Sequence, residues 1–116
     1  MNDFSYKKLI VWQKSMQLLK IIYGLIEKLP KSEEFNLKSQ MKRAAVSIVS
    51  NIAEGSCRKS GLERKRFYEI SRSSLIEVDA QLEICVLLQY VDTADCEVIN
   101  NWLMEVFRML TKMIDG

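Results

Sequence analysis

Histidine is absent from the chain of 116 residues. Imidazole is the side chain that most often moves protons near neutral pH, and it is a frequent metal ligand. Its absence excludes a Ser-His-Asp hydrolase, a His-dependent ribonuclease and a di-iron centre built on Glu-x-x-His motifs. A Gly-rich phosphate loop of the form GxxxxGK[ST] is also missing. Sites built from carboxylates alone remain possible in principle, with Glu54, Glu69 and Glu77 as first candidates. Acidic residues on amphipathic helices are usually solvated or ion-paired, so we expect no enzymatic activity, no cofactor and no metal site.

Proline and glycine are scarce, with one Pro and four Gly in the whole chain. These residues interrupt regular structure, so their scarcity favours long helices over a strand-rich fold. The length is that of one domain, and a hydrophobic content of 48% is enough for a packed core. We therefore expect a single domain spanning residues 1–116, with no internal repeat.

Long hydrophobic runs and paired cysteines are missing as well. No stretch of 18 apolar residues occurs, and the first residues, MNDFSYKK, lack the apolar region of a signal peptide. These features predict a soluble, cytoplasmic protein that does not enter a membrane. The three cysteines are odd in number and lack CxxC spacing, which argues against a disulfide framework and a zinc site and predicts reduced thiols.

Four segments show the apolar spacing of amphipathic helices. The first begins at Ile10 or Val11 and ends at Leu29, where Pro30 stops it. The second follows Asn36, a predicted N-cap, and ends at Gly55 or continues weakly to Lys59. Its core-facing stripe comprises Leu37, Met41, Ala44, Ala45, Ile48 and Ile52.

The remaining two segments also carry start signals. Ser60 and Glu63 form a predicted capping box for a helix that runs from Gly61 or Leu62 to about Gln89. Thr93 is the predicted cap of the last helix. Because the links between the four helices are short, neighbouring helices must run antiparallel. The sequence therefore predicts an all-α, up-down-up-down four-helix bundle.

Two helices carry more apolar surface than one bundle face needs. The first helix has Val11, Leu18, Ile21 and Leu25 outside its seam, so it lies deep in the core or is shared with a neighbouring subunit. The second helix has an additional apolar strip. This strip indicates a further partner, either another helix of the same chain or another copy of the protein. We expect identical copies to associate, with these interface residues: Val46, Val49, Ala53, Leu18 and Leu25.

Polar side chains in the second helix have structural roles in this interpretation. The small Ser47 allows close helix approach, and Glu54 can pair with Arg58 one turn later. The amide of Asn51 is expected to tie the second helix to the third or to a neighbouring subunit, with ligand binding as the alternative.

The charge is unevenly distributed although the net charge is only +2. Residues 36–66 carry eight basic and two acidic side chains, and residues 69–116 carry three basic and nine acidic ones. Five cations converge between the second and third helices, and we call them the basic turn: Arg58, Lys59, Arg64, Lys65 and Arg66. Such a cluster attracts phosphates, although a solubilising loop is the alternative reading. Farther along the same helices, Arg43 comes level with Glu77, which predicts a salt bridge.

The run SQMKRAAVSIVSNIAEGSCR resembles the signature of a known family. Its members are small four-helix bundle proteins encoded in intervening sequences of bacterial large-subunit ribosomal RNA genes, and it includes the accessory variability determinant proteins of diversity-generating retroelements. LIVWQKSM and RFYEISRSSLIEVDAQLEI are also similar. The resemblance implies a homo-oligomeric ring such as a pentamer, and no established enzymatic activity. Many members have Pro where this chain has Val49, so a straighter helix is expected here.

These observations give one leading hypothesis and one alternative. The leading hypothesis is an oligomeric, non-catalytic bundle that binds nucleic acid, RNA or DNA, nonspecifically through the basic turn. The alternative, suggested by the resemblance, is a protein-docking scaffold for a partner such as a reverse transcriptase.

Overall fold

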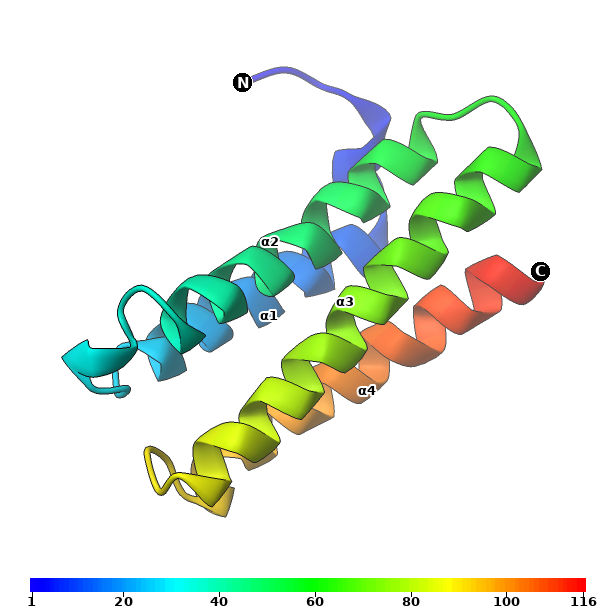
Figure 1. Cartoon of the computed structure of the whole chain (residues 1–116). Coiled ribbons are helices and arrows are strands. Elements are labelled where there is room, and N and C mark those ends of the chain that lie inside the picture. The colour runs from blue at the N-terminus through cyan, green and yellow to red at the C-terminus, as the bar shows by residue number, and fades with distance from the viewer.

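The computed structural model describes residues 1–116 as helices and links, without a strand. The long helices are α1 (Ile10–Ile26), α2 (Leu37–Ser56), α3 (Gly61–Leu87) and α4 (Thr93–Asp115), and two short 3-10 helices, η1 (Ser5–Lys8) and η2 (Lys31–Glu33), precede α1 and α2. Each long helix lies against the next, and α1 lies against α4, whereas the backbones of the diagonal pairs do not approach closely. Neighbouring helices run antiparallel (Figure 1). The predicted up-down-up-down bundle is therefore confirmed.

One hydrophobic core runs through the middle of the bundle and takes side chains from all four helices. The predicted stripe of α2 is buried at all six positions. On α4, an apolar side chain faces inward at every third or fourth position of the chain, from Ile99 to Ile114. This periodic burial is the main stabilising term, because each large aliphatic side chain removed from water contributes roughly 1.5–3 kcal/mol.

The apolar excess of α1 is hidden within the single chain. Leu18 is 1% exposed and Leu25 is 5% exposed, so the prediction that these two residues lie at an interface between copies is wrong. The physical reason is that α1 lies between α2 and α4, which cover both flanks of its wide apolar face. The α2 strip remains accessible: Val46 is 43% exposed, and Val49 and Ala53 are half-buried.

The helix ends differ in detail from those expected. Helix α1 ends at Ile26, three residues before Leu29, because Lys28 and Leu29 instead form turn hydrogen bonds to Leu25 and Ile26. Helix α3 ends at Leu87, and Gln89 then takes a positive φ of 62° that turns the chain toward α4. Helix α2 runs without interruption through Val49, as expected from the missing proline.

Two helix N-termini, those of α2 and α4, are capped differently from what the sequence predicts. Asn36 holds the N-cap position of α2, but its side-chain oxygen accepts a hydrogen bond from Gln40 Nε2 (2.8 Å) and caps no backbone group. The cap of α4 is Asp92, one residue before the predicted Thr93. Asp92 Oδ1 accepts from the Asp95 amide at 2.8 Å, and Asp95 Oδ2 accepts from the Asp92 amide at 3.1 Å. Two carboxylates at a helix N-terminus also suit the helix dipole, which explains why Asp92 displaces Thr93.

Helices α2 and α3 make the most extensive contact in the bundle, and small polar residues line it. The buried Ser71 hydroxyl donates to the Ile48 carbonyl oxygen (2.8 Å), and the Ser47 and Ser74 hydroxyls share a hydrogen bond of 2.8 Å. These bonds satisfy hydroxyls that would be costly to bury without a partner.

Gly55, in the last turn of α2, is the tightest point of this contact. A Cβ atom at Gly55 would lie 2.8 Å from Tyr68 Cε1 and 3.0 Å from Phe67 Cβ. The absent side chain therefore allows the aromatic residues of α3 to pack directly on the α2 backbone.

None of the helices combines the length and the apolarity that crossing a membrane requires. All three cysteines are unpaired: Cys57 is exposed, Cys96 is half-buried, and Cys85 lies in the core. Burial raises the pKa of the Cys85 thiol to about 11, which keeps it protonated and unreactive at neutral pH.

Two glycine substitutions test the close approach of α2 and α3. We expect Gly55→Ala to lower the free energy of unfolding by about 1–3 kcal/mol, because the aromatic side chains must move away from the new methyl group. A Cβ atom added at Gly24, in α1, would meet no neighbouring atom within 4 Å. Gly24→Ala should therefore raise the free energy of unfolding by about 0.5–1 kcal/mol. Urea denaturation measures both, and equal effects of the two variants would contradict the packing described.

Candidate nucleic-acid interface

The basic turn lies at one end of the bundle, together with the N-terminal segment and the C-terminus (Figure 1). Its backbone is fixed on both sides. Helix α2 ends at Ser56, and helix α3 begins at Gly61. The Ser60 hydroxyl accepts a hydrogen bond from the Glu63 amide (3.0 Å), which confirms Ser60 as a cap, although the reciprocal half of the predicted capping box is not formed.

Arg64 holds the turn together from within. Its Nη1 donates to the carbonyl oxygens of Arg58 and Lys59, both at 2.9 Å. These carbonyls follow the C-terminal end of α2, where unpaired oxygens and the helix dipole favour a cation. Arg64 is half-buried, so part of its guanidinium is committed to the fold and unavailable to a ligand.

Arg58 is also engaged within the chain. Its Nη2 donates to Glu54 Oε2 at 2.8 Å, which confirms the predicted pair one helical turn apart. Its guanidinium carbon lies 4.7 Å from the centroid of the Phe67 ring, and its Nε is buried without a hydrogen-bond partner. The carboxylate neutralises much of the charge of Arg58, and the Phe67 ring and the Glu54 carboxylate together restrain the guanidinium.

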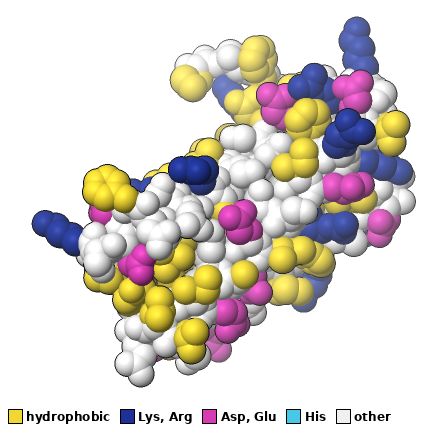
Figure 2. Space-filling model, viewed as in Figure 1, with side chains coloured by type: hydrophobic (Ala, Val, Ile, Leu, Met, Phe, Trp, Pro, Cys, Tyr) yellow, Lys and Arg dark blue, Asp and Glu magenta, His cyan; other side chains and the backbone are white.

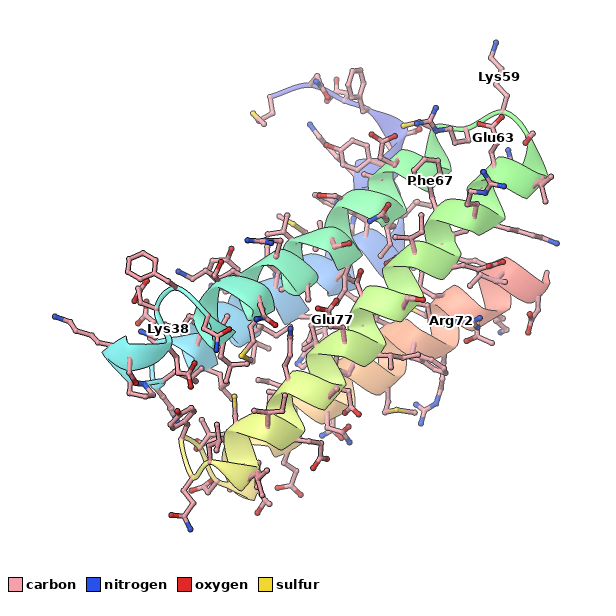
Figure 3. All side chains as sticks on the ribbon, viewed as in Figure 1. Lys38, Lys59, Glu63, Phe67, Arg72 and Glu77 are labelled. Carbon is pink, nitrogen blue, oxygen red and sulfur yellow. The ribbon has the colours of Figure 1, made fainter.

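The other three cations of the basic turn are free. Lys59, Lys65 and Arg66 are exposed, and none takes part in an ion pair. Lys59 projects away from the turn into solvent (Figure 3). Lys and Arg side chains gather at this end of the visible face, with a few carboxylates among them (Figure 2). The structure thus divides the predicted site into two arginines that shape the turn and three cations that can meet an anion.

Tyr68, in the second turn of α3, is buried between α3 and the end of α2. It is 6% exposed and packs against Gly55. Burial raises the pKa of the Tyr68 phenol, and the nearby charge of Arg64 acts in the opposite direction. Tyr68 therefore stays neutral at physiological pH and serves as packing beneath the basic turn.

Two polar residues of α2, Asn51 and Arg43, make contacts other than those expected. Asn51 does not reach α3 directly: its Nδ2 donates to the Ser47 carbonyl oxygen (2.8 Å) and to Ser47 Oγ (3.0 Å). Ser47 makes the link to α3 through Ser74. Arg43 also differs from expectation, because it forms no ion pair with Glu77, and its only side-chain hydrogen bond is a long one to Ser39 (3.5 Å).

The opposite end of the bundle is acidic. Lys28 donates to Asp95 Oδ1 at 2.6 Å, and this hydrogen bond lowers the pKa of Asp95. Tyr90 donates to Glu33 Oε2 at 2.7 Å and so joins the two links at this end. A groove between α3 and α4 is lined by apolar side chains and by three carboxylates without an ion pair: Asp79, Glu83 and Glu97.

The position of the N-terminal segment beside α2 is not predicted by any sequence pattern. Helix η1 contacts both α1 and α2, and Figure 1 shows the segment beside the second half of α2. Lys7 and Lys8 thereby lie at the same end as the basic turn. The contact depends on tertiary packing, and the only local signal was the density of aromatic and basic residues in FSYKK.

Comparisons with known proteins agree with this architecture. Residues 7–112 match the sequence model of the family described as 23S rRNA-intervening sequence protein. A crystal structure of a protein of unknown function from the S23 ribosomal protein family of Bacteroides thetaiotaomicron superposes with a TM-score of 0.84 at 26% sequence identity. The alignment covers 92% of this chain and 100% of that one. No curated protein matches the chain.

The neighbouring residues Arg64 and Lys65 allow the structural role of one cation to be compared with the exposed position of the other. Arg64→Ala should lower the free energy of unfolding by about 1–2 kcal/mol, because two carbonyl oxygens at the end of α2 lose their donor. Lys65→Ala should change stability by less than about 0.5 kcal/mol, since Lys65 is exposed and unpaired. Chemical denaturation of both variants measures this difference, and a Lys65 effect as large as that of Arg64 would refute the assignment.

Proposed function

The chain belongs to the 23S rRNA-intervening sequence protein family, and from its charge distribution we propose that it is a non-catalytic protein that binds nucleic acid through the basic turn. The observation that carries the proposal is the trio of exposed, unpaired cations, Lys59, Lys65 and Arg66, at one end of the bundle. The absence of histidine supports a non-catalytic role.

The contacts at the turn favour binding without sequence preference. Long, exposed side chains at a helix start can follow phosphates, but they are not held in the fixed geometry that base-edge recognition requires. About three phosphate contacts for each copy would make the logarithm of the affinity fall with the logarithm of salt concentration, with a slope of roughly −3 on duplex DNA. One copy alone therefore binds weakly.

Self-association would multiply this affinity, and we include it in the proposal. The α1–α2 face and the α3–α4 face lie on opposite sides of the bundle, since α1 is diagonal to α3 and α2 is diagonal to α4. The first face carries the exposed Val46 near Lys42, whose Nζ lies 5.7 Å from the centroid of the Tyr23 ring. The second face carries the acid-rimmed groove, with Ile76 and Met104 exposed. Opposite faces of complementary charge suit head-to-tail contacts, which can close into a ring such as a pentamer.

A protein-docking scaffold is the second candidate function, and the same groove favours it. Three unpaired carboxylates around an apolar floor suit a basic amphipathic helix of another protein. The two candidates differ in what the basic turn does: a scaffold that acts only through the groove would not need Lys59, Lys65 and Arg66.

Single charge reversals test nucleic-acid binding. We expect Lys59→Glu and Lys65→Glu each to weaken binding to a fluorescent duplex about five- to tenfold at 50 mM salt and to reduce the salt slope by about one or more. Lys31→Glu makes the same charge change at the far end of the bundle and should alter affinity less than about twofold. Fluorescence anisotropy measures all three, and absence of binding at low salt, or equal effects at the three positions, would leave the docking scaffold as the better function.

Light scattering tests self-association. The wild type should have a mass several times that of the 13.5 kDa chain at micromolar concentration. Val46→Asp should reduce this mass, because it places a carboxylate on the face proposed to meet an acidic groove. Phe35→Asp alters a residue that is 96% exposed in the α1–α2 link and should have no effect. A wild-type mass of 13.5 kDa would contradict the oligomer.

A further inference from the structure

Three aromatic rings form a series from the core to the surface at the basic end. Trp12 packs against the core, and the Tyr6 ring meets it edge-on, with centroids 5.1 Å apart and an interplanar angle of 74°. The Phe4 ring lies 6.5 Å from the Tyr6 ring and is tilted by 55°. Phe4 is 62% exposed, so the series ends in an aromatic ring that is accessible to solvent.

The segment that carries Phe4 is held in position by specific contacts. The Lys7 amide donates to the Phe4 carbonyl oxygen (3.2 Å), and Lys7 Nζ donates to the side-chain oxygen of Asn2 (3.1 Å). Gln13 Nε2 donates to the Lys7 carbonyl oxygen (2.9 Å), which ties the segment to α1. Because η1 also contacts α2, Phe4 is presented on the fold at the same end as the basic turn.

A second planar group lies in the basic turn. The guanidinium of Arg58 lies over the Phe67 ring and is paired with Glu54, and 40% of its side chain is exposed. Figure 3 shows Phe67 pointing from α3 toward the end of α2. Since its charge is already compensated, the feature that Arg58 offers to a ligand is a preoriented flat surface. Lys59, next in the chain, supplies a free cation beside it.

We infer that the basic end binds single-stranded nucleic acid, with unpaired bases stacked on Phe4 and on the Arg58 guanidinium while Lys59, Lys65 and Arg66 contact phosphates. This inference rests on the proposed nucleic-acid binding and specifies its ligand. Aromatic rings and guanidinium planes stack on the faces of unpaired bases, and every base has such a face, so the preference requires no particular sequence. In a duplex these faces are covered by neighbouring base pairs.

The direct test removes the bases and keeps the phosphates. Fluorescence anisotropy compares a labelled 12-nucleotide strand of deoxyadenosine with a strand of equal length whose residues are abasic, and with a 12-base-pair duplex. At one salt concentration the deoxyadenosine strand should bind about tenfold more tightly than the abasic strand, with the same salt slope for both. It should also bind more tightly than the duplex.

Variants then assign the stacking groups. Phe4→Ala should weaken binding to the deoxyadenosine strand about five- to tenfold and leave the abasic strand unaffected, whereas Phe35→Ala, at an exposed Phe of the opposite end, should change neither. Arg58→Lys keeps the charge and removes the plane, so it should behave like Phe4→Ala. Thermal unfolding of each variant separates these effects from loss of structure.

The outcomes distinguish this inference from the function on which it rests. Equal affinities for the deoxyadenosine, abasic and duplex probes, with no effect of Phe4→Ala or Arg58→Lys, would overturn the stacking inference and leave nucleic-acid binding in place. If no probe binds at 50 mM salt, the proposed function and the inference both fail.

Discussion

The close contact between α2 and α3 is the constraint on which the rest of the structure depends. Glycine at position 55 and serines at positions 47, 71 and 74 keep side-chain volume low along this seam, and hydrogen bonds satisfy the serine hydroxyls that the contact buries. The contact brings Phe67 and Tyr68 against the end of α2. It thereby fixes the turn between the helices, and with it the positions of the cations that the turn carries.

The turn shows how charge can serve either structure or recognition. Arg64 and Arg58 are next to cations of the same cluster, yet one caps backbone carbonyls and the other is held between a carboxylate and an aromatic ring. Their commitment leaves Lys59, Lys65 and Arg66 on a rigid base. The opposite end of the bundle is acidic, so the two ends differ in charge and an anion is attracted to only one of them. The proposed nucleic-acid binding depends on this polarity between the two ends.

Periodicity and turn chemistry predicted the architecture well, because local sequence decides both. The α2 stripe, the Ser60 cap and the Glu54–Arg58 pair are all present in the structure. Tertiary choices could not be predicted in the same way. Leu18 and Leu25 are covered within the chain because α1 has a neighbour on each flank, and Arg43 lacks its expected partner although Glu77 is nearby. The place of Phe4 beside the basic end depends on how η1 packs, which no local pattern encodes.

The claim that the basic end of the bundle is its functional end can be tested residue by residue. The most direct measurement is a titration of the ¹⁵N-labelled protein with a short single-stranded oligonucleotide, followed by amide chemical shifts. We expect the largest shifts in residues 58–67 and in the N-terminal segment before α1, while amides of the α3–α4 link stay unchanged. Shifts concentrated along the acid-rimmed groove, or absent at millimolar oligonucleotide and low salt, would contradict it.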